Sequence, residues 1–493
     1  MARRRPTTVA IVLAGGRGER FWPRSRADLP KPFLPLLGER SLLQEAYARA
    51  RMVADGGAVF VVTARAFAAR VRRHLPDLEP DHLVVEPVGR DTAPALALAM
   101  ATVRARVGEA VAVALPADHW VDDAAAFAAA CRRAAAVAAR TGGPVLLGVR
   151  PTRPETAYGY ILPARASGRA GWAPVSAFRE KPPAAEALRL MREGALWNAG
   201  VFAWRPEAYL EAVHRRLPAV ARAAEALAAA GGRRGEGARA FAALEPVSVD
   251  HGLLEGAEGT CVVPGRFGWD DVGGWGALAR LGDADAQANV VRGRALALEC
   301  ENVTVDSGAG RLVVAFGLRD AVVVDSADVV LVVARERAGD LKRVTAALRE
   351  RGLGSYLART GGAYTPEGAR VVPKPWGREV WWAETERYLG KLLEVEPGQA
   401  LSLQYHREKR ETILVLSGAG RVTLGGGPPV PIGPGSRVDL PPGTVHRLEA
   451  GADGLTAVEV STPEADDVVR LEDRYRRRTG RERATQKATR RSS

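Results

Sequence analysis

Residues 9–38 constrain the fold of this chain more than any other stretch. They begin with an apolar run at 9–13, which is typical of a strand buried on both faces. Three glycines follow closely: Gly15, Gly16 and Gly18. Because glycine has no Cβ, its backbone N–H can approach an anion closely, and Arg20 and Lys31 add positive charge. The stretch therefore predicts a phosphate-binding turn after a buried strand, although its spacing is not that of a dinucleotide or P-loop fingerprint.

The chain then alternates short apolar runs with helical patterns. Strands are expected at 58–64, 82–87 and 110–120, and helices at 41–52, 95–106 and 124–140. This alternation predicts an α/β domain with a Rossmann-like, mostly parallel sheet that is covered on both faces. Ligands of such sheets bind at the carboxyl ends of the strands, which brings residues 15–20, residues 90–92 and Asp118 to one edge.

The pattern of expected secondary structure changes twice towards the C-terminus. Short β-rich runs and a helical pattern fill residues 287–352, and after Trp376 short strands alternate with Gly and Pro, as in small β-barrels. The expected organisation has four parts: the α/β domain at 1–284, a β-rich connector at 285–360, a β-barrel at 361–475, and a basic, disordered tail at 476–493.

The net charge of +13 does not by itself indicate a nucleic-acid partner. Arginines cluster at 3–5 and 476–491, and such runs are usually solvated tails. The three cysteines, Cys131, Cys261 and Cys300, form no CxxC pair, which argues against a disulfide framework or zinc knuckle and fits a reducing compartment. The N-terminal segment resembles a signal peptide, but its apolar part is short. No apolar run in the sequence approaches the roughly twenty residues that span a bilayer. We expect a cytoplasmic protein without a membrane or nucleic-acid partner.

The string LAGGxGxRFWPxSRxxxPKPFL, with GRDTAPA at 89–95, resembles the mannose-1-phosphate guanylyltransferases, which are nucleotidyltransferases that make sugar nucleotides. The resemblance implies transfer of a guanylyl group from GTP to α-D-mannose 1-phosphate, in GDP-mannose and polysaccharide biosynthesis. It also implies a set of nucleotide-binding residues: Leu13, Ala14, Gly15, Gly16, Gly18, Arg90, Asp91 and Thr92. For residues 90–92 the alternative is a turn and helix cap.

Two carboxylates are candidates for a Mg²⁺ site. Asp118 ends a buried strand and Asp271 lies in WDDVGGW, and paired carboxylates commonly hold Mg²⁺ together with a triphosphate. Either aspartate alone could instead cap a helix, but both match family positions that hold the metal, whereas Asp270 stands one residue too early. With Arg20 and Lys31 they form the expected catalytic set. The resemblance further implies a sugar-phosphate side: Gly159, Glu180, Lys181 and Asn198.

The C-terminal barrel carries four side chains that suit a divalent metal. Gln404 and His406 are two residues apart and share a strand face, and Glu411 and His446 would come from neighbouring strands. Such a set fits Zn²⁺, Mn²⁺ or Fe²⁺. The spacing resembles the two cupin motifs, with Gln404 where a first histidine often stands and Ala450 in place of a final Asn.

The segments PWGRE, LSLQYH, PPGTVHRLEA and DDVVRLEDRY resemble the C-terminal half of bifunctional type II phosphomannose isomerases. The resemblance implies interconversion of mannose 6-phosphate and fructose 6-phosphate, with Arg447 as a candidate isomerase contact. The chain departs from that family at five positions: Arg407, Glu408, Lys409, Thr412 and Ile413. The metal site is expected to survive these changes, and the cupin is either an isomerase or a ligand-binding regulatory module.

Two alternatives to the leading hypothesis stay open. One is a nucleotidyltransferase for another base or another sugar 1-phosphate, because base choice depends on few contacts. The other is a sugar-nucleotide sensor without catalysis, although the intact phosphate and metal residues argue against it. The sequence allows a homo-oligomer without indicating one.

Overall fold

The computed structural model describes residues 6–16, 18–164, 171–232, 235–255, 257–308, 311–326, 328–357, 370–385, 387–464 and 467–475. The arginines at 3–5 and the basic tail at 476–493 lie outside these ranges. The chain divides into two compact units, residues 1–359 and 360–493, each of which is described by itself.

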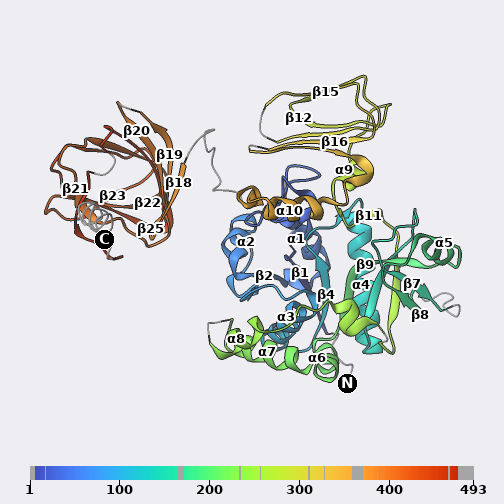
Figure 1. The fold of residues 1–493 in the computed structure, drawn as a ribbon. Coiled ribbons are helices and arrows are strands. Elements are labelled where there is room, and N and C mark those ends of the chain that lie inside the picture. The colour runs from blue at the N-terminus through green and yellow to red at the C-terminus, as the bar shows by residue number, and fades with distance from the viewer. Residues whose placement is uncertain are drawn as a thin grey trace, which may run out of the picture. The chain divides into compact units, whose positions relative to one another are not determined.

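The first unit is built on a nine-stranded sheet with the order β3-β2-β1-β4-β9-β6-β10-β8-β7 (Figure 1). Its strands are β1 (Thr7–Leu13), β2 (Val59–Ala64), β3 (Leu83–Glu86), β4 (Ala110–Pro116), β6 (Val145–Val149), β7 (Tyr160–Pro163), β8 (Ala173–Arg179), β9 (Leu196–Trp204) and β10 (Cys261–Gly265). Strands β1 to β4 are mutually parallel, as are β6 and β10, whereas β9 runs antiparallel between β4 and β6. The expected α/β class is confirmed, and the carboxyl ends of β1 to β4 meet at one edge.

Helices pack on both faces of this sheet. They are α1 (Leu42–Val53), α2 (Ala68–His74), α3 (Thr92–Val107), α4 (Ala124–Thr141), α5 (Ala184–Arg192), α6 (Pro206–Arg216), α7 (Pro218–Ala229) and α8 (Glu236–Ala242). In β1, Ala10 and Val12 join the core that contains α1 and α4, while Val9 and Ile11 join the core that contains α3 and α7. Successive side chains of a strand point to opposite faces, so a strand between two cores is apolar at every position.

Two element boundaries have clear local causes. Helix α1 begins after Ser41, whose hydroxyl accepts from the backbone of Gln44 while the Gln44 side chain accepts from the Ser41 N–H, a capping box. Helix α3 begins at Thr92, three residues before the expected start, because Asp91 caps it. The strand expected at 110–120 is divided into β4 and β5 (Trp120–Val121), and Asp118 lies in the break.

The β-rich connector belongs to the first unit. Its elements are α9 (Trp275–Leu281), β12 (Val290–Gly293), β13 (Ala295–Leu298), β14 (Thr304–Ser307), β15 (Val313–Phe316), β16 (Ala321–Asp325), β17 (Val330–Ala334) and α10 (Leu341–Glu350). Strands β12, β14 and β16 pair in parallel in one sheet, and β13 and β15 pair in parallel in another, which makes a short coil. One core joins Phe21 and Trp22, after the glycine loop, to Trp275 and to Val322 and Leu331 of the coil.

The second unit is a mainly antiparallel barrel. Its strands are β18 (Arg370–Lys374), β19 (Gly377–Glu384), β20 (Leu389–Val395), β21 (Leu403–Tyr405), β22 (Glu411–Leu424), β23 (Val430–Ile432), β24 (Arg437–Leu440), β25 (His446–Ser461) and β26 (Val469–Glu472). The long strands β22 and β25 pair along most of their length, and Gln404 of β21 pairs with His446 of β25. This pairing brings the start of β25 beside Gln404, whereas His406, which was expected on the same strand, follows the end of β21.

Among the described residues, no helix has the length and apolar character needed to cross a membrane. Cys131, Cys261 and Cys300 are all buried free thiols.

Candidate active sites

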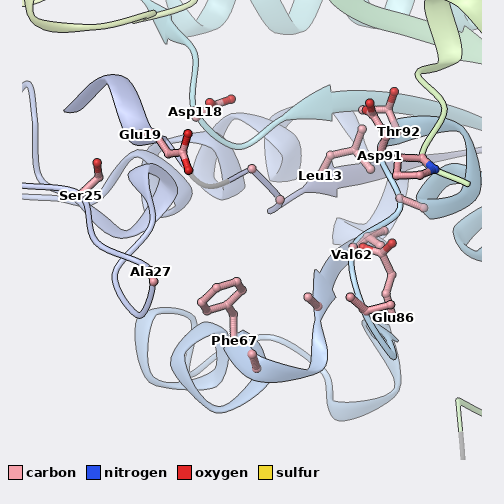
Figure 2. A pocket seen from close by; sticks show the side chains of 18 of the residues that line it. Leu13, Glu19, Ser25, Ala27, Val62, Phe67, Glu86, Asp91, Thr92 and Asp118 are labelled. Atoms are coloured by element: carbon pink, nitrogen blue, oxygen red, sulfur yellow. Dashed lines mark hydrogen bonds between the residues drawn. The ribbon is translucent and has the colours of Figure 1, made fainter. Parts of the chain in front are cut away.

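The ends of β1, β2, β3 and β4 surround a cavity of about 870 Å³. Six of the predicted residues line it: Leu13, Gly15, Gly16, Asp91, Thr92 and Asp118. Figure 2 shows Asp91, Thr92 and Glu86 at one end, and Glu19, Ser25 and Asp118 at the other. A cavity at the carboxyl edge of parallel strands is where ligands of this sheet type bind.

The glycine loop after β1 packs closely against Lys31. Gly18 has a φ of 60°, and a Cβ there would lie 2.4 Å from the Cβ of Lys31, so glycine is required both for conformation and for space. The Lys31 side chain is buried, and its Nζ donates to Asp118 Oδ2 at 2.7 Å and to the Asp271 carbonyl at 2.6 Å. One ammonium group thereby joins the glycine loop to both predicted metal ligands.

The two predicted carboxylates sit in polar surroundings. Burial acts to raise the pKa of Asp118, but the charges of Lys31 and His119 outweigh it and hold the pKa below its usual value. Asp271 Oδ1 accepts a 2.9 Å bond from the Tyr158 hydroxyl. Arg20 also lies close, because a Cβ on Gly273 would be 2.9 Å from Asp271 Oδ1 and 3.3 Å from Arg20 Nη1. The structure therefore brings Arg20, Lys31, Asp118 and Asp271 together.

Asp270 has different partners from its neighbour Asp271. It is 2% exposed, and its Oδ2 binds Arg280 at 2.8 Å and Arg153 at 3.4 Å. Its Oδ1 accepts from the backbone N–H of Val272. Both oxygens of Asp270 are used by the protein itself.

Three predicted nucleotide-binding residues do not line the cavity. Ala14 is 2% exposed in the core, and its N–H donates to the Val62 carbonyl at 2.8 Å. The Arg90 side chain donates to the carbonyl of Ala242 instead, which fastens the loop before α3 to the end of α8. Gly18 packs on Lys31 rather than facing the cavity. Asp91 and Thr92 do line it, although both also make the alternative cap and turn contacts: Asp91 caps α3 and Thr92 Oγ1 accepts from Val249 N–H at 2.8 Å.

The predicted sugar-phosphate residues form a second group within the first unit. A Cβ on Gly159 would lie 2.7 Å from Glu180 Oε2, so glycine leaves room for this carboxylate. The Gly159 carbonyl accepts from Asn198 N–H at 2.8 Å, and Lys181 Nζ binds Glu180 Oε1 at 2.6 Å. Asp250, which we did not predict, accepts from Asn198 Nδ2 at 3.1 Å. Burial, with a contribution from Glu180, raises the pKa of Asp250 to about 6.

Other residues around the cavity were missed as well. Glu86 ends β3 and lines the cavity, and Thr345 and Arg349 reach the same cavity from α10. Tyr158 directly precedes Gly159, which was predicted. Burial and the charge of Asp271 raise the pKa of the Tyr158 hydroxyl, so this hydroxyl stays protonated. The position of Glu86 at the end of a strand was a signal from which it could have been predicted. For Thr345 and Arg349 the sequence gives no local signal, because α10 lies more than 300 residues after the glycine loop.

The second unit brings all four predicted cupin ligands together. Atoms of His406, Glu411 and His446 lie within 4.8 Å of one another, and all three residues are buried. Glu411 Oε1 is 3.0 Å from His446 Nε2 and 3.6 Å from His406 Nε2. Gln404 Nε2 lies 3.5 Å from His446 Nε2. The nitrogen and oxygen atoms of this set are donors that divalent transition metals accept.

Backbone carbonyls fix the orientation of both histidines. His446 Nδ1 contacts the Thr444 carbonyl at 3.0 Å, and His406 Nδ1 contacts the Asp467 carbonyl. A carbonyl can only accept, so each Nδ1 carries a proton and each Nε2 is the nitrogen directed at the cluster. His406 Nε2 is buried without a hydrogen-bond partner among the described residues, as expected of a metal-binding nitrogen.

Two charged residues near the cluster differ in their positions. Lys409 is buried, and Glu459 and Glu411 overcome the effect of burial and raise its pKa, so it is a cation bound to Glu411 Oε2. Arg447 follows His446 on β25, so its side chain leaves the opposite face of the strand, and it binds Glu472 Oε2 at 2.7 Å. The structure does not bring Arg447, our candidate isomerase contact, to the cluster.

Comparisons with known protein families cover most of the chain. The Nucleotidyl transferase model matches residues 9–288, the MannoseP isomerase/GMP-like beta-helix domain matches 293–348, and the Mannose-6-phosphate isomerase C-terminal domain matches 365–473.

Similar proteins extend over nearly the same length. The Xanthan biosynthesis protein XanB of Xanthomonas campestris pv. campestris (strain B100) is 36% identical, over 95% of this chain and 98% of its own. The Mannose-1-phosphate guanylyltransferase of Escherichia coli (strain K12) is 34% identical, over 95% and 98%. A crystal structure described as mannose-1-phosphate geranyltransferase from Thermus thermophilus is 40% identical and covers 69% of this chain and 99% of its own, with a TM-score of 0.63. The chain therefore belongs to the nucleotidyltransferase family of the mannose-1-phosphate guanylyltransferases that carry a C-terminal mannose-6-phosphate isomerase domain.

Proposed function

We propose that the chain transfers a guanylyl group from GTP to α-D-mannose 1-phosphate, releasing pyrophosphate and forming GDP-mannose. The observation that carries the proposal is the position of Lys31, whose Nζ binds Asp118 and the Asp271 backbone beside the glycine loop. The names of the full-length relatives support the choice of substrates.

The transfer needs positioning and charge stabilisation rather than a covalent intermediate. An oxygen of the sugar 1-phosphate attacks the α-phosphorus of GTP in line, and pyrophosphate departs on the opposite side. Backbone N–H groups of Gly15 and Gly16 hold the triphosphate, and Arg20 and Lys31 balance the charge that develops on the transferring and leaving groups.

Asp118 and Asp271 would hold Mg²⁺ in this site. Each uses one carboxylate oxygen within the protein, towards Lys31 and Tyr158 respectively, and the remaining oxygens are the hard donors that Mg²⁺ prefers. When bound, the ion neutralises phosphate charge and orients the triphosphate. Glu180, Lys181 and Asn198 would hold the sugar phosphate, with Lys181 on the phosphate group.

A panel of substrates tests this function. The full-length protein is mixed with each nucleoside triphosphate and with mannose 1-phosphate, glucose 1-phosphate or no sugar, in the presence of Mg²⁺, and pyrophosphate release is measured. We expect release with GTP and mannose 1-phosphate together. Faster release with another pair would indicate a different sugar-nucleotide enzyme, and binding without release would indicate a sensor.

For the cupin we propose a second activity, the interconversion of mannose 6-phosphate and fructose 6-phosphate. The buried cluster of His406, Glu411 and His446, with Gln404, supports a divalent metal site, for Zn²⁺, Mn²⁺ or Fe²⁺. A bound metal would polarise the substrate oxygens while a base moves a proton between C1 and C2. The test is turnover of either hexose phosphate by the metal-loaded full chain. Metal binding without turnover would leave a ligand-binding regulatory cupin.

We also propose that the enzyme acts in the cytoplasm and supplies GDP-mannose for polysaccharide synthesis. Three free, buried cysteines are consistent with a reducing compartment. Two of the relatives are named for xanthan and alginate biosynthesis.

A further inference from the structure

The outer sheet of the connector has one face that the described part of the chain leaves uncovered. This sheet consists of β13 and β15, and Figure 1 shows β15 on the side of the coil away from the nine-stranded sheet. Its inner face is closed, because Ala295, Ala297 and Ala315 pack on the core of the coil. Successive side chains of a strand point to opposite faces, so the residues between these alanines point outwards. Together with the residue that precedes β15, the outward side chains are 41–65% exposed: Leu296, Leu298, Leu312, Val314 and Phe316.

The register of the two strands gathers these side chains into one surface. Leu296 lies beside Val314, and Leu298 lies beside Phe316. The sequences of the strands, ALAL and VVAF, contain no polar side chain. The centre of the surface is therefore entirely apolar.

The edge strand β17 of the other sheet extends this surface. Val332 pairs with Val323, which packs in the core between the two sheets, so Val332 points to the side that carries the outer sheet. Val330 is two residues away and shares this direction, and the two valines are 59% and 65% exposed. We call the five outward side chains of the outer sheet together with Val330 and Val332 the connector face.

The connector face is larger than a soluble monomer usually exposes. At these exposed fractions its seven side chains present on the order of 700 Å² of mainly apolar surface, whereas the largest patch of a typical monomer is about 300–600 Å². A specific interface buries about 800 Å² on each partner. The face and the residues around it therefore have the area that a stable dimer needs.

We propose that the connector face is the interface of a homodimer, in which the outer sheets of two copies of this chain pack face to face. Apolar sheets stack about 10 Å apart, with their side chains interdigitated. A two-fold axis brings the same surface of both copies together, so the surface must be complementary to itself.

Charges at the two ends of β13 supply this complementarity. Arg294 directly precedes the strand, Glu299 directly follows it, and both residues are exposed. With the facing strands antiparallel, the Arg294 end of one copy lies over the Glu299 end of the other. Facing strands in the parallel direction would instead oppose like charges. The proposed dimer is therefore antiparallel, and its occupant is a second copy rather than an unrelated protein.

Sedimentation of the full-length protein tests the proposal without any substrate. We expect the wild type at about 50 µM to have twice the chain mass of 52.4 kDa. The double variant Leu298→Glu/Phe316→Glu places carboxylates in the centre of the face, where pairing would remove them from water, and should raise the dissociation constant at least about 100-fold. Leu188→Glu, a change of the same kind at a 42% exposed leucine of α5, is the matched control and should sediment as the wild type.

A charge exchange tests the antiparallel arrangement. Arg294→Glu and Glu299→Arg should each weaken the dimer by about threefold to tenfold, and the protein with both changes should recover the wild-type dissociation constant. A charge-exchanged protein that remains weaker than both single variants overturns this arrangement. A wild type that is monomeric at about 50 µM overturns the dimer and leaves the face to a different partner. A Leu298→Glu/Phe316→Glu protein that melts cooperatively and keeps the wild-type mass also overturns it, because the dimer then uses another surface.

Discussion

Asp270 and Asp271 are adjacent in the chain, yet their carboxylates have different surroundings. Asp270 neutralises Arg280 and contacts Arg153 in a buried position, whereas Asp271 accepts from Tyr158 and lies beside Arg20. Removal of a carboxylate from a buried ion pair leaves its partners unpaired, whereas removal of a metal ligand abolishes a binding site. The two side chains should therefore have separable roles.

We expect Asp271→Ala to lose nearly all pyrophosphate release, more than about 100-fold, with little change in Tm. Asp270→Ala should instead lower the free energy of unfolding by about 2 kcal/mol, because Arg280 and Arg153 lose a buried acceptor. Activity assays and thermal melts of both variants check this. An Asp271→Ala protein that keeps most of its GTP-dependent release would remove Asp271 from the metal site.

The pKa of Glu86 predicts an unusual dependence of stability on pH. A carboxyl whose pKa rises from 4.5 to about 7 on folding binds its proton more tightly in the folded state, so its contribution to stability is lost as pH rises from about 4.5 to 7. Above pH 7 the buried charge destabilises the nucleotide-free protein by up to about 3 kcal/mol. Glu86→Gln should therefore be more stable than the wild type at about pH 8 and of similar stability at about pH 4.5 to 5, as measured by denaturant unfolding without nucleotide.

At the scale of elements, the connector supports the loop that follows the glycines. Arg349 of α10 binds Glu19 at 3.1 Å, and Arg24 binds Asp306 of β14 at 3.1 Å. The Trp22 indole donates to the Tyr356 carbonyl at 2.9 Å. The glycine loop is therefore held from one side by the sheet and from the other by the connector.

Arg349→Ala tests whether α10 contributes to nucleotide binding. Arg349 lines the cavity and is about half exposed, and charge contacts in such positions contribute up to about 1 kcal/mol. We expect KM for GTP to rise about fivefold with kcat less affected. Arg343→Ala, on the same helix but outside the cavity, is the control and should match the wild type.

The strands of the barrel decide which polar residues can share a site. Gln404 and His446 are directly paired, so their side chains emerge on the same face, and Arg447 emerges on the other. The sequence placed Arg447 beside a ligand, but neighbours along a strand are on opposite faces. A catalytic residue for the cupin would have to come from the face that holds the cluster.

At the scale of the whole molecule, the two compact units have separate cores. In the described residues, the clusters around the first sheet and the coil contain no side chain of the barrel, and the barrel core extends from Trp376 to Ala457 with Tyr475 against it. Cooperative packing within each unit means that a local change in one need not disturb the other.

We therefore expect His446→Ala to abolish binding of Zn²⁺ or Mn²⁺ by the cupin and any isomerase turnover, while transferase activity stays within about twofold of the wild type. Metal content after dialysis and both assays on the full chain provide the measurements. His214→Ala, an exposed histidine in the first unit, should change none of them. Loss of transferase activity in His446→Ala alone would show that the two units depend on each other.

Much of this protein follows from local sequence. The apolar run at 9–13 and the capping residue Ser41 predicted their elements because burial on two faces and helix capping are local demands. The four candidate cupin ligands lie together as predicted, although His406 follows the end of β21 and does not share the strand with Gln404. The sequence did not indicate that the Arg90 side chain donates to the Ala242 carbonyl, that Asp250 accepts from Asn198 or that Arg349 binds Glu19, because these partners are distant in the chain.

By itself, the sequence determined the α/β class, the glycine loop, the set of candidate metal ligands and the family to which the chain belongs. Only the tertiary structure decided which acids are neutralised and which face a cavity, and that α10 contributes Thr345 and Arg349 to the lining of that cavity. The physical reason is that strand and cap patterns repeat over a few residues, whereas the charge and solvation around a side chain are set by elements that meet only when the chain has folded.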